Sequence, residues 1–223
     1  MSDSPEAAGT DARLEEILER LAALERLVIA ERVEVAETSE GTEKDQPEAG
    51  GLVEAGRRPR TRAAPSLAER LELFIDGLGF PNFKGKEFTP YWSRERKGVK
   101  NSPPPEELWP NLVPTLAVLQ RFRTEFGKPV HLLSTYRSPA YNKAVGGEKG
   151  SKHMEFLAID FMCTLGKPSQ WAALLKSYRG KKFRNPHTGS DFTFRGGIGI
   201  YPVSGFVHVD TRGNDANWII PPP

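Results

Sequence analysis

The chain has 223 residues, of which 38% are hydrophobic and 27% are charged, and its net charge is +2. One ordinary domain with an appendage fits this length, because domains commonly hold about 100 to 150 residues. The single cysteine, Cys163, excludes an intrachain disulfide and a cluster of thiolate metal ligands. The sequence has no 18-residue apolar run, and its N-terminus lacks the basic leader and apolar core of a secretory signal. We therefore expect synthesis in the cytoplasm, no Sec export and no membrane span.

Charge is unevenly distributed along the chain. Residues 1–50 hold 14 acidic and 5 basic side chains, a net charge of −9, which leaves +11 on the remaining 173 residues. A basic domain beside an acidic arm predicts an anionic target. We expect no nucleic-acid partner, because the chain has no helix-turn-helix, zinc-finger or aromatic ribonucleoprotein pattern.

The acidic arm, residues 1–34, has the pattern of an amphipathic, coiled-coil-like helix. Apolar side chains recur at 3-4-3-4 spacing over about two heptads, at Leu14, Ile17, Leu21, Leu24 and Val28. An isolated helix of this length is marginal, so we expect self-association or docking to another protein. Packing of the helix on the domain is the alternative. Residues 35–65 are rich in Glu, Gly, Thr and Pro and are predicted to be a disordered linker.

Residues 66–223 are predicted to form an α+β domain. Ser66 and Glu69 make a capping-box pattern at the start of a helix that ends at Gly77. The remaining periodicity predicts helices at 108–126 and 168–178 and strands near 130–135, 158–162, 192–200 and 206–211, the last two joined as a hairpin. Helices that flank a small antiparallel sheet are typical of the α+β class.

Two segments carry the side chains of a metal site. The first runs Ser-Lys-His-Met-Glu-Phe-Leu-Ala-Ile-Asp and the second Phe-Val-His-Val-Asp, so that His153, Asp160 and His208 offer two imidazoles and one carboxylate. Zn²⁺ takes such ligands and keeps a fourth position for water in catalytic sites. The gap between His153 and Asp160 is too long for one helical face, which predicts a loop followed by a strand. Alternation in the second segment puts His208 and Asp210 on one strand face.

Three further motifs accompany these segments. They are Thr-Tyr-Arg-Ser-Pro-Ala-Tyr-Asn from Thr135, Gly-Gly-Ile-Gly-Ile-Tyr-Pro from Gly196, and Trp218. Together with the two ligand segments they resemble the D-alanyl-D-alanine carboxypeptidase-like zinc peptidases, a superfamily that includes murein endopeptidases and phage endolysins. The resemblance extends over residues 82–218.

The resemblance implies that His153, Asp160 and His208 hold zinc and that Arg137 faces the substrate. It also implies hydrolysis of a peptide bond in the stem peptides or crosslinks of peptidoglycan by metal-activated water. The protein would then reach the cell wall after lysis-type release or as part of a virion.

Two residues depart from the pattern of the family. Phe156 stands where relatives have a glycine, so we expect the loop to avoid a positive φ at this position and to differ in shape. Gly205 stands where many relatives have a carboxylate that serves as general base. The alternative function is therefore a catalytically degenerate cell-wall-binding or virion structural module that keeps the zinc site.

The remaining candidate site residues each have two possible roles. Asp210 is the candidate catalytic base, or it holds the imidazole of His208 in its tautomer. Arg137 binds a substrate carboxylate or oxyanion, or it pairs with an acid to fix its loop. Ser151 binds substrate or caps a loop. Glu155 is a weaker candidate for the base.

Overall fold

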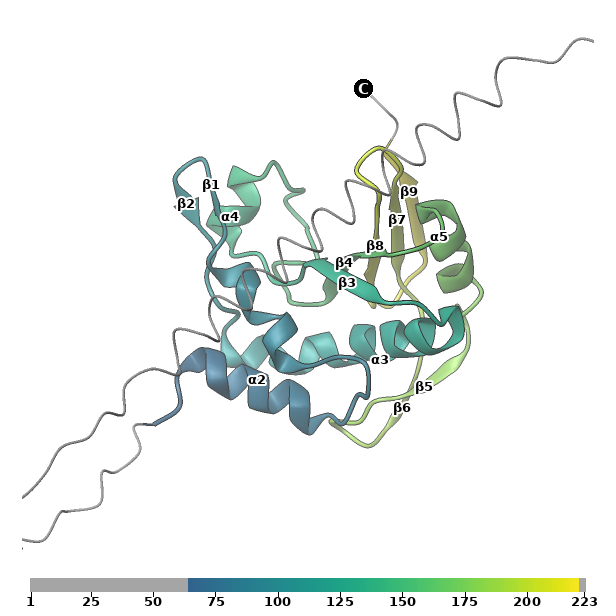
Figure 1. Ribbon diagram of the computed structural model, residues 1–223, viewed down its shortest axis with the longest axis horizontal. Helices are drawn as coiled ribbons and strands as arrows, with labels where there is room; N and C mark the ends of the chain where they lie inside the picture. The colour runs from purple at the N-terminus through teal and green to yellow at the C-terminus, as the bar shows by residue number, and fades with distance from the viewer. Residues whose placement is uncertain (1–63, 221–223) are drawn as a thin grey trace, which may run out of the picture. The chain divides into compact units, whose positions relative to one another are not determined.

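The computed structural model of the chain describes residues 64–220, in which helices pack on a five-stranded sheet (Figure 1). The predicted α+β class is confirmed. The predicted N-terminal helix and almost all of the predicted linker fall on residues 1–63, outside the described residues. Within residues 64–220, no helix is both long enough and apolar enough to cross a bilayer.

The main helices begin and end close to their predicted limits. In α2 (Leu67–Gly77) the capping box is present: the Ser66 hydroxyl accepts from the Glu69 amide at 3.3 Å, and the Ser66 amide donates to the Glu69 carboxylate at 2.7 Å. The long helix α3 (Trp109–Phe126) runs unbroken through Pro114. The shorter elements are α4 (Pro139–Ala144), α5 (Pro168–Lys176) and the 3-10 turns Gly85–Glu87, Thr89–Trp92 and Glu106–Leu108.

The central sheet has the strand order β3-β4-β8-β7-β9. Its strands are β3 (Val130–Ser134), β4 (Ala158–Cys163), β8 (Phe206–Asp210), β7 (Gly197–Tyr201) and β9 (Ala216–Ile219). The first four pair antiparallel, and β7 and β8 form the predicted hairpin. The edge strand β9, which was not predicted, pairs parallel with β7, so the sheet is mixed at this edge.

The single strand predicted at 192–200 is two strands. Asp191–Thr193 (β6) pairs with Lys182–Arg184 (β5) in a separate hairpin, and β7 begins only at Gly197. Between them the chain changes partner at Gly196, where a Cβ atom would lie 1.8 Å from the Asp210 carbonyl oxygen. Alternation of side chains does not reveal such a change of partner, which is why the prediction joined the two strands. A second small hairpin pairs β1 (Glu95–Arg96) with β2 (Val99–Lys100).

The two faces of the central sheet have different compositions. One face belongs to the hydrophobic core and carries the fully buried Ile159, Phe161, Ile198, Val207 and Val209. Helix α3 lies next to β4, and helix α5 lies next to β7 and β8. Side chains of both helices belong to the same hydrophobic core. On the other face, His208 of β8 lies between Asp160 of β4 and Gly199 of β7 in the strand register. The same alternation therefore builds the core and presents polar side chains on the opposite face.

Candidate metal centre

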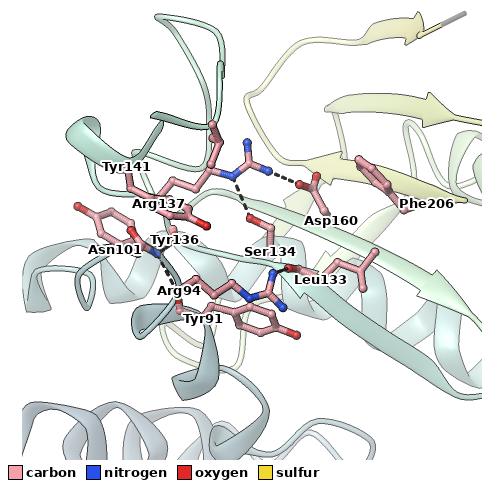
Figure 2. A pocket seen from close by; sticks show the side chains of 11 residues that line it. Tyr91, Arg94, Asn101, Leu133, Ser134, Tyr136, Arg137, Tyr141, Asp160 and Phe206 are labelled. Carbon is pink, nitrogen blue, oxygen red and sulfur yellow. Dashed lines mark hydrogen bonds and ion pairs between the residues drawn. The ribbon is translucent and has the colours of Figure 1, made fainter. Parts of the chain in front are cut away.

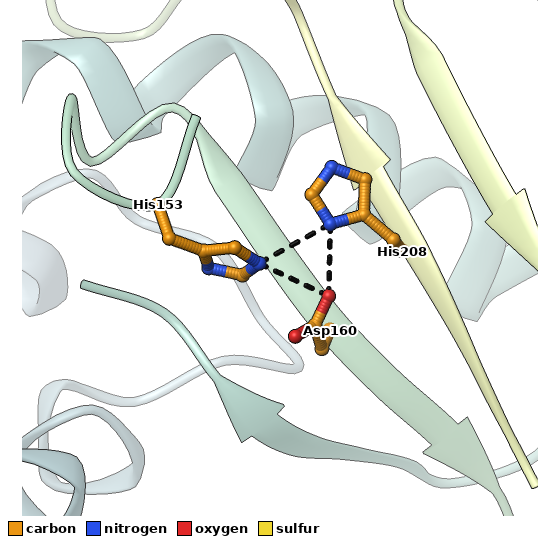
Figure 3. A group of neighbouring side chains, drawn as sticks. All are labelled: His153, Asp160 and His208. Atoms are coloured by element: carbon orange, nitrogen blue, oxygen red, sulfur yellow. Dashed lines mark hydrogen bonds and ion pairs between the residues drawn. The ribbon is translucent and has the colours of Figure 1, made fainter. Parts of the chain in front are cut away.

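The structure brings His153, Asp160 and His208 together (Figure 3). The separations are 3.1 Å between His153 Nε2 and Asp160 Oδ1, 2.9 Å between Asp160 Oδ1 and His208 Nδ1, and 3.2 Å between the two imidazole nitrogens. Ligands about 2.0 to 2.1 Å from a tetrahedral zinc ion lie about 3.3 Å from one another. All three side chains are buried. The group therefore has the composition and spacing of a zinc site, and we call it the metal centre.

Strand register and one loop contact position these ligands. Asp160 on β4 lies directly opposite His208 on β8, as expected for neighbouring strands. His153 comes from the loop before β4, and its carbonyl oxygen accepts a hydrogen bond from the Arg137 amide at 3.2 Å. That bond joins the ligand loop to the segment that follows β3.

Neighbouring groups fix the protonation of the first two ligands. His153 Nδ1 donates to the Thr135 carbonyl at 2.6 Å, which leaves the Nε2 lone pair directed at the metal centre. Burial lowers the pKa of His153 and so favours the neutral imidazole that a metal requires. The pKa of Asp160 is lowered although burial alone would raise it, and the carboxylate pairs with the Arg137 guanidinium.

The third ligand, His208, is held from the side away from the metal centre. Its Nε2 donates to Asp210 Oδ2 at 2.9 Å, while its Nδ1 faces the other ligands. Asp210 is fully buried and also accepts from the Gly197 amide at 3.0 Å and from the Arg212 guanidinium at 2.6 and 2.9 Å. Burial would raise the pKa of Asp210, but the hydrogen bonds from His208 and Arg212 lower it. Arg212 was not predicted as a site residue.

Trp218 on β9 packs over the same face of the sheet. Its ring centroid lies 5.1 Å from that of His208, and the Arg212 guanidinium lies 5.4 Å from its ring centre. A Cβ atom at residue 199 would lie 2.3 Å from the indole, so glycine leaves the room that the ring needs. Trp218 therefore packs against the site.

Arg137 lies next to the metal centre (Figure 2). Its guanidinium pairs with Asp160 Oδ2, and its Nε donates to the Ser134 hydroxyl at 2.9 Å. Asp160 thus directs one oxygen at the metal centre and the other at Arg137. The Arg137 side chain keeps 19% of its surface exposed, so the ion pair and contact with a substrate are compatible.

Two cavities meet at the metal centre. The smaller cavity has a volume of about 300 Å³ and the larger about 760 Å³. Both are lined by Arg137, Val145, Asp160 and Phe206, while His153 and His208 line only the larger one. A ligand that extends from one cavity into the other would therefore lie beside Arg137 and Asp160.

The loop that carries His153 and precedes β4 contributes to the larger cavity. Ser151 and Glu148 both line it, and the Asn142 side chain donates to the Glu148 carbonyl at 2.9 Å, which fixes the backbone there. Glu155 pairs with Lys152 at 2.6 Å and is absent from the described lining of both cavities. Glu148 was not predicted as a site residue.

The expectation about Phe156 is wrong. Its φ is +55°, the left-handed conformation that a glycine would adopt without strain. Such a conformation costs a non-glycine residue about 1 to 2 kcal/mol. The side chain is fully buried and packs edge-to-face on Tyr136 at 6.0 Å, and burial of a phenylalanine contributes about 1.5 to 3 kcal/mol. Packing therefore offsets the strain, and the ligand loop keeps the left-handed turn.

The sequence model of the family described as Peptidase M15 matches residues 81–210. That span contains the metal centre, Arg137 and Asp210. Neither the comparison with curated proteins nor the comparison with solved structures finds a match to this chain.

Proposed function

This chain belongs to the M15 family of zinc peptidases, and we propose that it hydrolyses a peptide bond in the stem peptides or crosslinks of peptidoglycan. The observation that carries the proposal is the buried metal centre at the junction of two cavities. Zinc bound by His153, Asp160 and His208 would polarise a carbonyl group and lower the pKa of a coordinated water to near neutral.

Arg137 is proposed to bind the substrate beside the metal centre. It lines both cavities and already contacts Asp160, so its guanidinium borders the path of a peptide that crosses the centre. A guanidinium there stabilises negative charge that develops on the scissile carbonyl oxygen. Ser151, in the larger cavity, is proposed to hydrogen-bond the peptide backbone.

Asp210 is proposed to be a positioning residue. It contacts the imidazole nitrogen of His208 that points away from the other ligands, and Arg212 and Gly197 occupy its remaining oxygen sites. This placement supports the second of its two predicted roles, in which it holds the imidazole in its tautomer.

Glu148 is proposed to accept the proton during hydrolysis. Among the described residues that line the two cavities, it is the only carboxylate besides the ligand Asp160. A carboxylate in reach of the substrate is a suitable general base, and its geometry commonly tightens when the substrate binds.

One observation favours the alternative, a wall-binding module without turnover. Residue 205 lies in the turn between β7 and β8 and is a glycine, so it offers no carboxylate where many relatives of the resembled superfamily have one. In either case we propose that the protein acts at the cell wall after lysis-type release or in a virion, and that the helix predicted from the sequence of residues 1–34 mediates self-association or docking.

The test is digestion of purified peptidoglycan, with the released muropeptides identified by mass spectrometry. Zinc-loaded protein should release alanine or break crosslinks, whereas chelated protein and His208→Ala should not. His131→Ala is the matched control, because His131 is exposed and contacts Thr164 rather than the metal centre. An intact wall in the presence of zinc-loaded protein would support the binding module instead.

A further inference from the structure

The β1–β2 hairpin carries an excess of positive charge. Residues 94–100 contain four cationic side chains and one carboxylate. Three of the cations, Arg96, Lys97 and Lys100, are exposed. Within residues 64–220, none of these three side chains has an ion pair or a hydrogen bond. Their charge is therefore left for a partner outside the domain.

Helix α4 extends this charge beyond the hairpin. The helix lies beside both β1 and β2 (Figure 1), and Lys143 in its last turn is exposed. No residue in the described part of the chain pairs with the Lys143 ammonium group. We call the four side chains together the basic surface: Arg96, Lys97, Lys100 and Lys143.

The tip of the hairpin holds a lysine in a strained backbone conformation. Lys97 has a φ of +50° and Gly98 a φ of +73°, whereas such two-residue turns favour Asn-Gly or Asp-Gly. At Phe156 a comparable strain is offset by burial, but the Lys97 side chain is exposed. Strain without compensating contacts in the described residues is typical of a position that serves function. The lysine at this turn is therefore explained best by a contact made outside the domain.

A buried side chain fixes the hairpin to the rest of the domain. Asn101 follows β2, and its amide group donates to the Tyr91 carbonyl at 3.0 Å and to the Tyr136 carbonyl at 2.8 Å. Its Oδ1 accepts from the amide of Ser138, the N-cap of α4, at 2.9 Å. The hairpin and α4 are thus held in a fixed arrangement, so their cations form one surface.

We propose that the basic surface binds an anionic phosphodiester polymer of the cell wall, such as a chain of polyol phosphates. This inference rests on the proposed function, which puts the substrate of the protein in the wall. Ammonium and guanidinium groups form charge-assisted hydrogen bonds with phosphate oxygens. The four cations are distributed over a hairpin and a helix, an arrangement that suits repeated phosphates along a chain.

The surroundings of the basic surface favour this polymer over two other polyanions. Binding of single-stranded nucleic acid commonly uses aromatic rings on which bases stack, but Tyr91, Trp92 and Tyr136, which flank the hairpin, are buried. Binding at a membrane surface uses apolar side chains that enter the lipid, and the one apolar side chain of the hairpin, Val99, is half-buried. The surface therefore suits a ligand that presents phosphates without bases or acyl chains.

The first measurement is binding of purified poly(glycerol phosphate) to the chelated full-length protein by calorimetry. A triple variant, Arg96→Gln with Lys97→Asn and Lys100→Gln, should weaken binding about tenfold, as expected for the loss of three exposed charge contacts. The affinity of the wild type should also fall as salt is added, because screening weakens contacts between exposed charges. Wild-type affinity in the triple variant would overturn the proposal.

The matched control removes the same number of positive charges elsewhere. Lys128→Gln, Lys176→Gln and Lys182→Gln are combined, because these lysines are exposed and have no acidic partner within residues 64–220. Helix α5 and strand β5, which carry two of them, lie on the other side of the domain from β1 and β2 (Figure 1). Polymer affinity should stay within about twofold. Equal losses in the two triple variants would show attraction by net charge and reject the surface.

The single variant Lys97→Asn separates a binding role from a structural one. Asparagine tolerates a positive φ better than lysine does, so the denaturation midpoint should rise by about 2 °C. Polymer affinity should fall about twofold at the same time. A variant that is more stable and binds the polymer as tightly as the wild type would show that Lys97 has no part in binding.

Two further ligands and one reaction complete the test. Vesicles of anionic phospholipid and single-stranded DNA, at equal phosphate concentration, should bind the wild type more weakly than the polymer, and tighter binding of either would reject the wall polymer. The zinc-loaded triple variant should hydrolyse a soluble stem pentapeptide with the wild-type kcat and KM. Polymer binding that depends on the basic surface, without hydrolysis by zinc-loaded wild type, would keep the surface and reject the proposed hydrolase. Hydrolysis without polymer binding would reject the surface alone.

Discussion

The two sides of the metal centre differ in how fully their polar groups are paired. On the inner side, Asp210 is completely buried, and His208, Gly197 and Arg212 supply hydrogen bonds to both of its oxygens. On the outer side, Arg137 is 19% exposed, and the side chain of Arg94, which lines the smaller cavity, contacts a carbonyl oxygen and an aromatic ring among residues 64–220. The comparison indicates that the inner side holds the geometry of the ligands, whereas the outer side retains donors for a substrate.

The largest effect is expected where the two sides meet. Asp160→Asn removes the carboxylate that serves both the metal centre and Arg137. Zinc affinity should fall by more than about 100-fold, the upper end of the cost of losing an outer hydrogen-bond partner. Zinc retained after dialysis and activity on peptidoglycan should both be lost. Retention of zinc at the wild-type level would show that two imidazoles suffice.

On the outer side, Arg137→Gln should lower kcat by about 100- to 1,000-fold, as expected for loss of one donor to a developing oxyanion. Zinc affinity should change much less, because the Asp160 oxygen that faces the metal centre is not the one that pairs with Arg137. Turnover and metal content measured on the same preparation test this separation. A parallel loss of zinc would mean that Arg137 belongs functionally to the inner side.

The base proposed for the larger cavity is tested by a pair of variants. Glu148→Gln should lower kcat by about 100-fold, within the usual contribution of general acid–base catalysis. Glu155→Gln is the matched control, because Glu155 pairs with Lys152 and is absent from the described lining of both cavities. If Glu148→Gln kept the same kcat as Glu155→Gln, Glu148 would not be the general base.

On the inner side, Asp210→Asn should weaken zinc binding about 10- to 100-fold while the fold is retained. The asparagine side chain is neutral, so His208 Nε2 loses its negatively charged hydrogen-bond acceptor. Arg212 loses its carboxylate partner at the same time. Competition with a chelator measures the affinity, and excess zinc should restore most of the activity. Activity that stays low at saturating zinc would instead support Asp210 as the base.

The smallest effect is expected far from both sides, at Glu125. Hydrogen bonds from Tyr178 and Arg121 lower the pKa of the exposed Glu125 carboxyl. A carboxyl group whose pKa is lower in the folded state stabilises the fold at pH values above its unfolded-state pKa. This contribution is lost as the pH falls through its folded-state pKa. Denaturation midpoints of the wild type and Glu125→Gln should therefore differ slightly at pH 7 and converge in acid. Zinc binding should be unaffected.

Two of the three candidate ligands, Asp160 and His208, lie on strands that the sequence predicted, whereas His153 lies on a loop and was identified by its residue type and by the resemblance to the family. Alternation in β8 put His208 and Asp210 on one face, and a neighbouring strand supplied Asp160. Arg94, which lines the smaller cavity, was not predictable in this way, because it donates a hydrogen bond to Leu133, 39 residues further along the chain. Similarly, the parallel pairing of β9 depends on how the chain returns to β7, which a four-residue strand with little burial does not encode.

The left-handed turn at Phe156 shows a different limit of the sequence. A glycine preference describes the backbone alone, whereas the conformation adopted also depends on what the side chain packs against. Phe156 is buried against Tyr136, a contact between the ligand loop and the segment after β3. Packing of the phenylalanine therefore stabilises a backbone conformation that a glycine would adopt without strain, which the expectation from backbone preference alone missed.

The position of Trp218 provides the protein with its own optical reporter. Its indole lies against His208 and Arg212, whereas the other three tryptophans of the chain, Trp92, Trp109 and Trp171, lie in the hydrophobic core. Binding of an ion to His208 should therefore change the emission of one indole against a constant background. The difference in fluorescence between the wild type and Trp218→Phe would follow occupancy of the site in real time, without a label or a substrate.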